Sequence, residues 1–158
     1  MIRYATLDDL SELLAIYASA KEFMHSHGNP TQWVGAYPDE ETLREDVRRH
    51  QLFVQYDEEG IYACFALIGG EDPTYGVIED GAWRSHEPYG TIHRIAGNRR
   101  KKGVFAECVA FARRHYSHLR VDTHEDNLPM QGAILKSGFR YAGIIRLADG
   151  SPRRAYEG

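Results

Sequence analysis

The feature that most constrains this chain is the run from Ile92 to Phe111, which changes character twice. It begins with β-branched residues typical of a strand, including Ile92, and then enters a turn of glycine and basic residues between Gly97 and Gly103. An apolar pattern with helical spacing follows the turn. The N-terminus of a helix carries unpaired N–H groups and a partial positive charge, so a strand, a cationic turn and a helix in this order favour anion binding. We therefore predict a pyrophosphate site for a nucleotide-like cofactor.

Length and charge set the outer limits. The chain has 158 residues, which fits one domain built around one core. Its formal net charge of −4 argues against a nucleic-acid partner, and the basic run at 99–102 is too short to change that expectation. No window is long and apolar enough for a membrane span, and the N-terminus has no apolar signal core. The two cysteines, Cys64 and Cys108, lie in apolar segments and are expected to be buried free thiols, which favours a cytoplasmic setting.

The first half of the chain predicts a short N-terminal strand, two helices and a hairpin. Thr6 and Asp9 form a capping-box variant at the start of a helix expected over residues 7–24. A second helix is expected over 38–50, because a proline followed by acidic residues is typical of a helix start. Two apolar runs within 51–68 are separated by a tight acidic turn and predict a hairpin.

The second half predicts alternating strands and helices. A strand is expected at 75–79, and another ends near Ala96 before the central helix. The elements expected after that helix are a strand at 119–122, a helix at 127–137 ended by Gly138, and strands at 139–145 and 153–156. This alternation predicts an α/β layer structure with a mixed sheet.

Two blocks of the sequence resemble the GNAT-type acyl-CoA N-acyltransferase superfamily. The superfamily's turn usually reads Arg/Gln-x-x-Gly-x-Gly/Ala, and Arg100 and Gly103 match it in this chain. Phe105 stands where glycine or alanine is usual, so its ring is expected to turn into the core. The second block runs from Asn127 to Phe139 and resembles the superfamily's Asn-led helix that ends in Gly-Phe. The order of elements fits the superfamily over nearly the whole chain.

The resemblance implies a single GNAT-like N-acetyltransferase domain over residues 1–158. Its α/β fold would have a mixed, mostly antiparallel, splayed central sheet of about six or seven strands flanked by about four helices. It implies acetyl-CoA as the cofactor and transfer of an acetyl group to a primary amine of a small molecule or a peptide. The alternative is a non-catalytic module that binds CoA or a partner on the same fold. The protein would be a monomer or a homodimer.

The superfamily also implies which residues meet the cofactor. Its pantetheine arm lies along the strand before the turn, a role that falls here to Arg94, Ile95 and Ala96. The residues expected at the pyrophosphate are Arg100, Lys101, Lys102, Gly103, Val104 and Phe105. Gly103 would let the backbone approach an anion without a Cβ in the way. Asn127 matches a residue that often touches the cofactor arm, and a plain N-cap role is equally compatible with its position.

Amine acylation benefits from a base for the amine and an acid for the leaving thiolate. His93, in the strand that would carry the thioester, is the first candidate base and His124 the second, with structural roles as the alternative for both. Water can also carry the amine proton away. Many relatives use a tyrosine as the thiolate acid, but the corresponding position here is Ile134. Tyr75 and Tyr141 are possible replacements that spacing alone does not separate.

Aromatic residues in two turn-rich segments are the expected substrate walls. They are Trp33, Trp83 and Tyr89, and packing over the core or a dimer contact is the alternative for their loops. Glu79 and Asp80 are further carboxylates that would serve as a base, or as ordinary surface acids. We expect no metal site, because the histidines and acids show no metal-ligand spacing.

Overall fold

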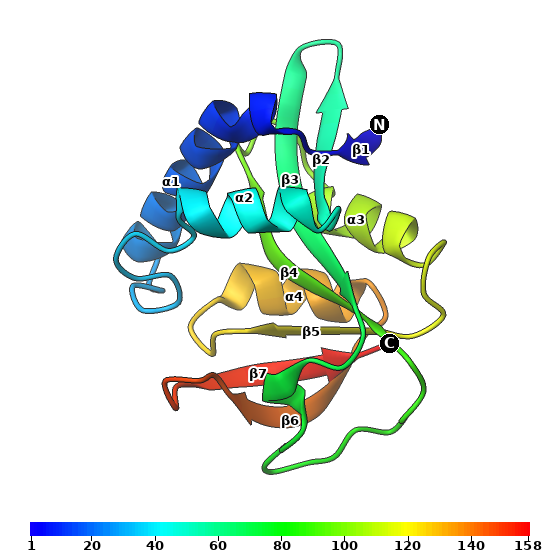
Figure 1. The fold of residues 1–158 in the computed structure, drawn as a ribbon. Helices are drawn as coiled ribbons and strands as arrows, with labels where there is room; N and C mark the ends of the chain where they lie inside the picture. Colours follow the sequence, from blue (N-terminus) through cyan, green and yellow to red (C-terminus); the bar gives the residue numbers. More distant parts are fainter. The chain divides into compact units, whose positions relative to one another are not determined.

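The computed structural model describes residues 1–158 and contains seven strands and four α-helices (Figure 1). The strands are β1 (Ile2–Tyr4), β2 (Leu52–Asp57), β3 (Gly60–Gly69), β4 (Gly90–Gly97), β5 (Leu119–Thr123), β6 (Arg140–Arg146) and β7 (Pro152–Glu157). The helices are α1 (Leu10–Ser26), α2 (Glu40–Arg48), α3 (Val104–Ala112) and α4 (Leu128–Lys136), with 3₁₀ helices at Leu7–Asp9 and Pro73–Tyr75.

The strands follow the order β1-β2-β3-β4-β5-β7-β6 in one sheet. Strand β1 is antiparallel to β2, β2 to β3, β5 to β7 and β7 to β6, whereas β4 and β5 are parallel. The strand and helix numbers and the mostly antiparallel sheet confirm the predicted α/β class.

The chain forms two compact units. Unit 1 comprises residues 1–67 and 93–104, and unit 2 comprises residues 68–92 and 105–158. Strand β4 contributes to both: its first three residues pair with β5 in unit 2, and its remainder, from His93, belongs to unit 1.

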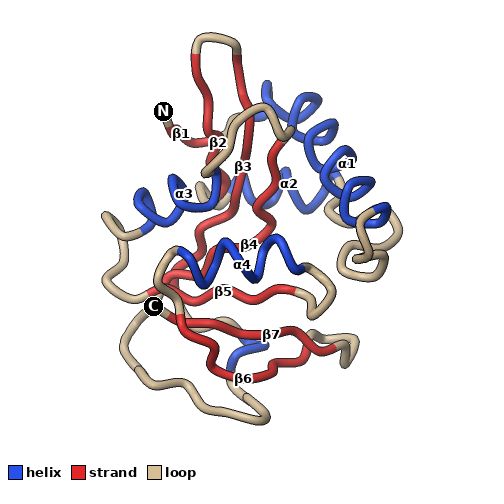
Figure 2. Tube along the Cα trace, turned by 180° about the vertical axis from the view of Figure 1, so that it is seen from behind, coloured by secondary structure: helices blue, strands red, loops and turns tan.

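Unit 1 is built from two helices that cover one face of its strands (Figures 1 and 2). The Asp9 carboxylate accepts the Thr6 N–H at 2.8 Å, so the predicted cap is present, although the first turn is 3₁₀. The apolar face of α1 packs with α2, with Leu52 and Val54 of β2 and with Ile61 and Cys64 of β3. The buried residues that make this core include Leu13, Ile16, Tyr17, Leu43, Leu52, Val54 and Cys64.

Unit 2 places α4 alongside β5 (Figures 1 and 2). Asn127 is the N-cap of α4 and accepts the Met130 N–H at 3.2 Å. Gly138 follows the helix with φ +90°, the left-handed conformation that a C-terminal glycine supplies at no steric cost. Both ends of this helix are therefore as the sequence predicts.

One predicted strand and one predicted helix start were wrong. Residues 75–79 do not form a strand: Pro73–Tyr75 is a 3₁₀ turn, because Asp72 accepts the Thr74 N–H, and only Glu79 bridges to β6. Helix α2 begins after Asp39 rather than at Pro38, because the Asp39 carboxylate caps Thr42 N–H at 2.9 Å.

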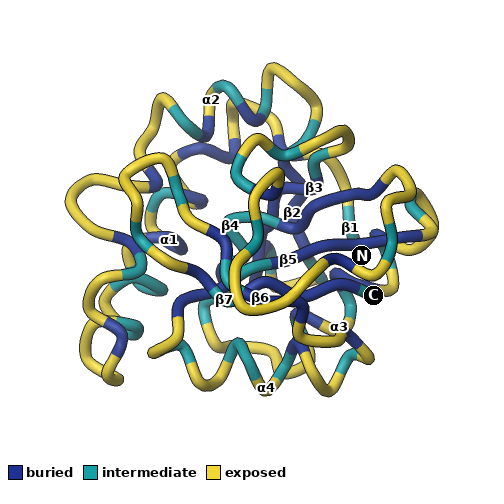
Figure 3. Tube along the Cα trace, turned by 90° about the horizontal axis from the view of Figure 1, so that it is seen from below, coloured by how far each residue is buried: buried dark blue, intermediate teal, exposed yellow.

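Buried residues are concentrated in the inner strands, while the edge strand β1, the turns and the outer faces of α2 and α4 are largely exposed (Figure 3). Cys64 and Cys108 are both buried and free, as predicted. The helices are all too short or too polar to cross a membrane. No three His, Cys, Asp or Glu side chains lie close enough together to hold a metal ion.

Candidate active site

Strand β4 has an irregular backbone at its centre. Arg94 has φ +49°, a conformation that a residue with a side chain adopts only when its surroundings hold it there. The Arg94 carbonyl accepts the Tyr17 hydroxyl of α1 at 2.6 Å. Burial raises the pKa of Tyr17 well above its ordinary value, so this hydroxyl stays a proton donor at neutral pH. The carbonyl of Arg94 is thus already paired within unit 1.

The Arg94 side chain is fixed as firmly as its carbonyl. Its Nε and Nη2 donate to the two carboxylate oxygens of Asp46 in α2, at 2.9 and 2.7 Å. The side chains of Arg94 and Asp46 are only 14% and 3% exposed, and Gln51 donates to the same carboxylate at 2.8 Å. Burial alone would lower the pKa of Arg94, but its interactions with Tyr37 and Asp46 outweigh burial and raise it. Helix α2 and strand β4 are therefore joined by a charged, bidentate pair.

The turn between β4 and α3 carries two left-handed residues. Arg99 has φ +65° and Gly103 has φ +73°. A Cβ on Gly103 would meet nothing within 4 Å, so glycine is needed there for backbone conformation, and its surroundings are open to a ligand. Gln55, fully buried in β2, donates to the Val104 carbonyl at 3.2 Å and fixes the first residue of α3. These features fit the diphosphate of a CoA-like cofactor, because first-turn amides of a helix have no partner within the helix.

The basic side chains of the turn are not equally available. Arg100 and Lys101 pair with acids at the tip of the β2–β3 hairpin. The guanidinium of Arg99 lies over the Phe23 ring, 4.9 Å from its centroid. Lys102 is exposed and takes part in none of these pairs. Lys102 and Arg99 are therefore the exposed cations of the turn that these acids do not pair with, and Lys102 is the one next to Gly103.

Two further predicted cofactor residues have structural partners. Phe105 is buried and lies 6.0 Å from the Phe139 ring, so its side chain turns into the core of unit 2, as expected. Asn127 is the N-cap described above. Ile95 is half-buried and Ala96 is buried, and both lie on β4 beyond Arg94. Cofactor contact by these residues stays a prediction.

The two candidate bases differ in their surroundings. His93 is half-buried on β4, next to the irregular residue Arg94, and belongs to unit 1. His124 is buried in unit 2, where its Nδ1 accepts the Asp126 N–H at 3.0 Å. Its backbone carbonyl accepts from Gln131 and Asn127 at the entry to α4. His124 therefore organises the start of a helix, whereas His93 lies on the strand that precedes the turn.

The residues considered for the thiolate acid are also distinguishable. Ile134 is fully buried in unit 2. Tyr75 is buried and donates to Asp122 at 2.6 Å, and burial raises its pKa well above the ordinary value. Tyr141 is 36% exposed and lies edge-on to Tyr156. Of the two tyrosines, Tyr141 is thus the one within reach of solvent.

The three aromatic residues expected at the substrate are buried. Trp83 and Tyr89 enclose the guanidinium of Arg120, whose central carbon lies 3.8 and 4.0 Å from their ring centroids. Trp83 also donates to the Tyr75 carbonyl at 2.9 Å. Trp33 packs edge-on against Tyr17, with ring centroids 5.7 Å apart. Substrate contact by these rings stays a prediction, and each ring also has a packing role.

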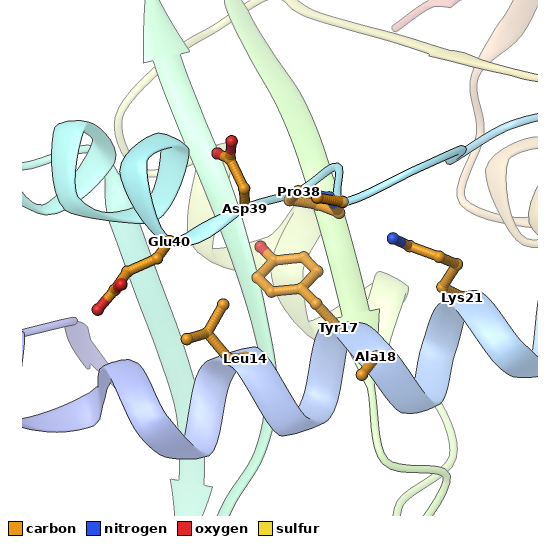
Figure 4. A pocket seen from close by; sticks show the side chains of 8 residues that line it. Leu14, Tyr17, Ala18, Lys21, Pro38, Asp39 and Glu40 are labelled. Carbon is orange, nitrogen blue, oxygen red and sulfur yellow. The ribbon is translucent and has the colours of Figure 1, made fainter.

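A hollow of about 270 Å³ lies in unit 1 between α1 and the segment that leads into α2 (Figure 4). It is lined by Leu14, Tyr17, Ala18 and Lys21 of α1 and by Ala36, Pro38, Asp39 and Glu40. Tyr17 lies in its middle, with Lys21 on one side and Asp39 and Glu40 on the other (Figure 4). The Tyr17 hydroxyl also donates to the Arg94 carbonyl, so one residue that lines the hollow contacts β4 directly.

Sequence reasoning missed Tyr17, Asp46 and the acids that hold Arg100. Tyr17 and Asp46 lie 77 and 48 residues from Arg94 along the chain, so no local pattern links them. The acids did leave a signal: the turn after β2 is the run Asp57-Glu58-Glu59, complementary to the basic run at 99–102. Two oppositely charged turns in one small domain are natural partners.

Comparison with known proteins gives fold relatives rather than sequence relatives. No family model and no curated protein matches the chain by sequence. A GNAT-family acetyltransferase from Streptococcus agalactiae 2603 is 26% identical, with a TM-score of 0.88 over 99% of this chain and 93% of its own. A ribosomal-protein-alanine N-acetyltransferase from Brucella melitensis is 21% identical, with a TM-score of 0.63 over 100% of this chain and 98% of its own.

An N-acetyltransferase from Staphylococcus aureus Mu50 is 19% identical, with a TM-score of 0.63 over 100% of this chain and 96% of its own. The identities of 21% and 19% are low, so these two similarities are evidence for the fold alone. All three relatives are acetyltransferases, and the resemblance extends over nearly the full length of each. The chain therefore has the fold of the GNAT acetyltransferase superfamily, as its two sequence blocks predict.

Proposed function

We propose that the protein is an acetyl-CoA-dependent N-acetyltransferase that acts on a primary amine of a small molecule or a peptide. The observation that carries the proposal is the β4–turn–α3 segment, in which a left-handed Gly103 precedes a helix N-terminus beside an exposed Lys102. The similarity to a GNAT-family acetyltransferase over almost the whole chain supports the same activity.

The chain's own residues would divide the work as follows. Amides at the start of α3 and the Lys102 ammonium would bind the diphosphate. Bound acetyl-CoA would supply a thioester; the amine nitrogen would bond to its carbonyl carbon as the C–S bond breaks, and the CoA thiolate would leave and take a proton from solvent. The half-buried His93 on β4 would take the amine proton, directly or through a water molecule. Asp39 and Glu40 place negative charge on one side of the hollow, which would attract a protonated amine.

Calorimetric titration of the purified protein with acetyl-CoA tests the first step. We expect saturable binding in the micromolar range, and no binding at several hundred micromolar would contradict the proposal. Turnover is then measured as release of free thiol across a panel of primary amines. Cys64 and Cys108 are buried, so they add no background to a thiol reagent in the native protein. Binding without thiol release on any amine would favour the non-catalytic module.

Substitution of His93 tests the assigned base. We expect His93→Gln to lower kcat by about a hundredfold with little change in the KM for acetyl-CoA, because general base catalysis contributes at least that much. The loss should shrink as pH rises and the amine deprotonates unaided. His124→Gln is the matched control, and a larger loss of kcat there than at His93 would reverse the assignment.

A further inference from the structure

The Arg100 side chain is held by the β2–β3 hairpin. Its Nη1 donates to Asp57 Oδ2 and Glu59 Oε2 at 2.9 and 2.6 Å. Its Nη2 donates to Asp57 Oδ1 and the Gly60 carbonyl at 2.8 and 3.1 Å. A guanidinium has five N–H groups, so these four bonds leave about one N–H for any external anion. A phosphate could therefore form a bidentate pair with Arg100 only by breaking some of these bonds.

Asp57 is the centre of the arrangement. Besides Arg100, it accepts the Lys101 ammonium at 3.1 Å and the backbone N–H of Glu59 at 2.9 Å. The hydrogen bonds from Arg100 hold the pKa of Asp57 far below its ordinary value, so the carboxylate stays charged throughout the physiological range. Both cations also lie over the Tyr62 ring, at 5.4 and 5.8 Å from its centroid.

The backbone of the turn is tied to the same hairpin. Asn98 donates its N–H to the Tyr62 carbonyl at 3.0 Å, and its side-chain oxygen accepts the Arg100 N–H at 3.0 Å. Beyond Arg100 the chain has the left-handed Gly103 before α3 begins, and a left-handed glycine allows many conformations. The Asp57 carboxylate, paired with Arg100 and Lys101, therefore ties the turn to the hairpin just before the amides that face the proposed diphosphate.

From this geometry we propose that Arg100 and Asp57 are positioning residues of the anion site: the acidic hairpin holds the turn in its binding shape through Arg100. The charge that meets the ligand comes from Lys102 and the first-turn amides of α3. The inference rests on the proposed CoA-binding function, and it reverses the expected role of Arg100, which acts on the loop rather than on the phosphate.

A double-mutant cycle separates positioning from direct contact. Arg100→Ala, Asp57→Ala and the double variant are titrated with CoA by calorimetry. We expect each single change to weaken CoA binding about fivefold and the double variant to lose about the same, because coupled partners are not additive. The KM for acetyl-CoA should rise equally while kcat is unchanged. Glu58→Ala, in the same turn but outside these ion pairs, is the matched control and should leave affinity unchanged.

Direct contact predicts the opposite sign for one variant. If Arg100 bound the phosphate, Asp57→Ala would release it and tighten CoA binding, while Arg100→Ala would weaken it. Tighter binding by Asp57→Ala, or additive losses in the double variant, would overturn the proposal.

A measurement without ligand separates this proposal from the proposed function. Amide hydrogen exchange of residues 98–104 in the free protein should speed up about fivefold in both single variants and not in Glu58→Ala. Unchanged exchange in the Asp57 and Arg100 variants would overturn the tether. If the wild-type protein bound no CoA but amide exchange still became faster in both variants, the proposed function would be contradicted and the positioning role of Arg100 and Asp57 would be supported.

Discussion

At the level of single residues, the conformation of the backbone shapes residues 94–103 as much as charge does. Three of these residues, Arg94, Arg99 and Gly103, are left-handed, and only one of them is glycine. Each non-glycine residue is held by its side chain: Arg94 by Asp46, and Arg99 by its contact with Phe23. Gly103 has no such anchor, so its conformation depends on the absence of a Cβ.

Replacement of Gly103 tests that dependence. Gly103→Ala should lower the free energy of unfolding by about 1–2 kcal/mol, because an L-residue pays roughly that much in the left-handed region. The space around the new methyl group is open, so no steric clash adds to the loss. Gly132→Ala, in the exposed middle of α4, should instead stabilise by about 0.5–1 kcal/mol. Urea denaturation measures both, and no loss at Gly103 would show that the turn can adopt a negative φ.

Lys102 tests which charge meets the ligand. An exposed charge contributes about 0.2–1 kcal/mol, so Lys102→Ala should weaken CoA binding by a factor of roughly 1.4 to 5 and flatten its dependence on salt. Lys101→Ala is the matched control, because the Lys101 ammonium is paired with Asp57. A steeper loss for Lys101 than for Lys102, measured by titration at two ionic strengths, would contradict this order.

At the scale of elements, the pair between Arg94 and Asp46 joins α2 to β4. The Tyr17 hydroxyl joins α1 to the same residue of β4. Both helices of unit 1 are therefore anchored on one irregular position of the strand that would carry the acyl group. A change in either helix should reach that position through these bonds.

The strength of this anchor is measurable. Asp46→Ala leaves the guanidinium of Arg94 buried without its partner, and loss of one member of a buried pair costs about 3–5 kcal/mol. Arg44→Ala, in the same helix, breaks an exposed pair with Glu40 and should cost about 0.5 kcal/mol or less. Urea denaturation of the two variants compares them, and equal losses would mean that the buried pair contributes no more than a surface pair.

The sequence predicted the ends of helices better than it predicted which strands and side chains pair. Asn127 and Gly138 marked the ends of α4 because caps act within one turn of the chain. The strand predicted at 75–79 was wrong because strand pairing depends on tertiary contacts, which a local pattern does not show. The Asp72 side chain caps a 3₁₀ turn at the same place instead. The partners of Arg94 and Arg100 lie tens of residues away, so charge type was visible in the sequence but pairing was not.

At the scale of the whole molecule, the two units each contain one buried cysteine: Cys64 in unit 1 and Cys108 in unit 2. Burial raises the pKa of Cys64 to about 12 and that of Cys108 well above its ordinary value. Both are thus protonated thiols near pH 8, and a thiol reagent needs the thiolate. Reactivity at either position therefore reports opening of its own unit.

We expect no labelling of the native protein by an alkylating reagent at pH 8 over an hour, and complete labelling of both thiols in denaturant. Cys64→Ser and Cys108→Ser variants leave one thiol each and give the opening rate of each unit separately. Addition of acetyl-CoA should slow labelling of the thiol in whichever unit it stabilises. Rapid labelling of the native wild-type protein would contradict the burial of both side chains.

Each unit also contains one tryptophan, so the intrinsic fluorescence of the protein can report on each unit. Trp83 in unit 2 faces the Arg120 guanidinium at 3.8 Å, whereas Trp33 in unit 1 touches Tyr17, whose hydroxyl rests on Arg94. The two indoles should therefore differ in emission wavelength and intensity. The emission of Trp33 should change when a change at β4 moves Tyr17. With Trp83→Phe as the background, fluorescence of the single remaining indole would follow events at β4 in real time, without any added dye.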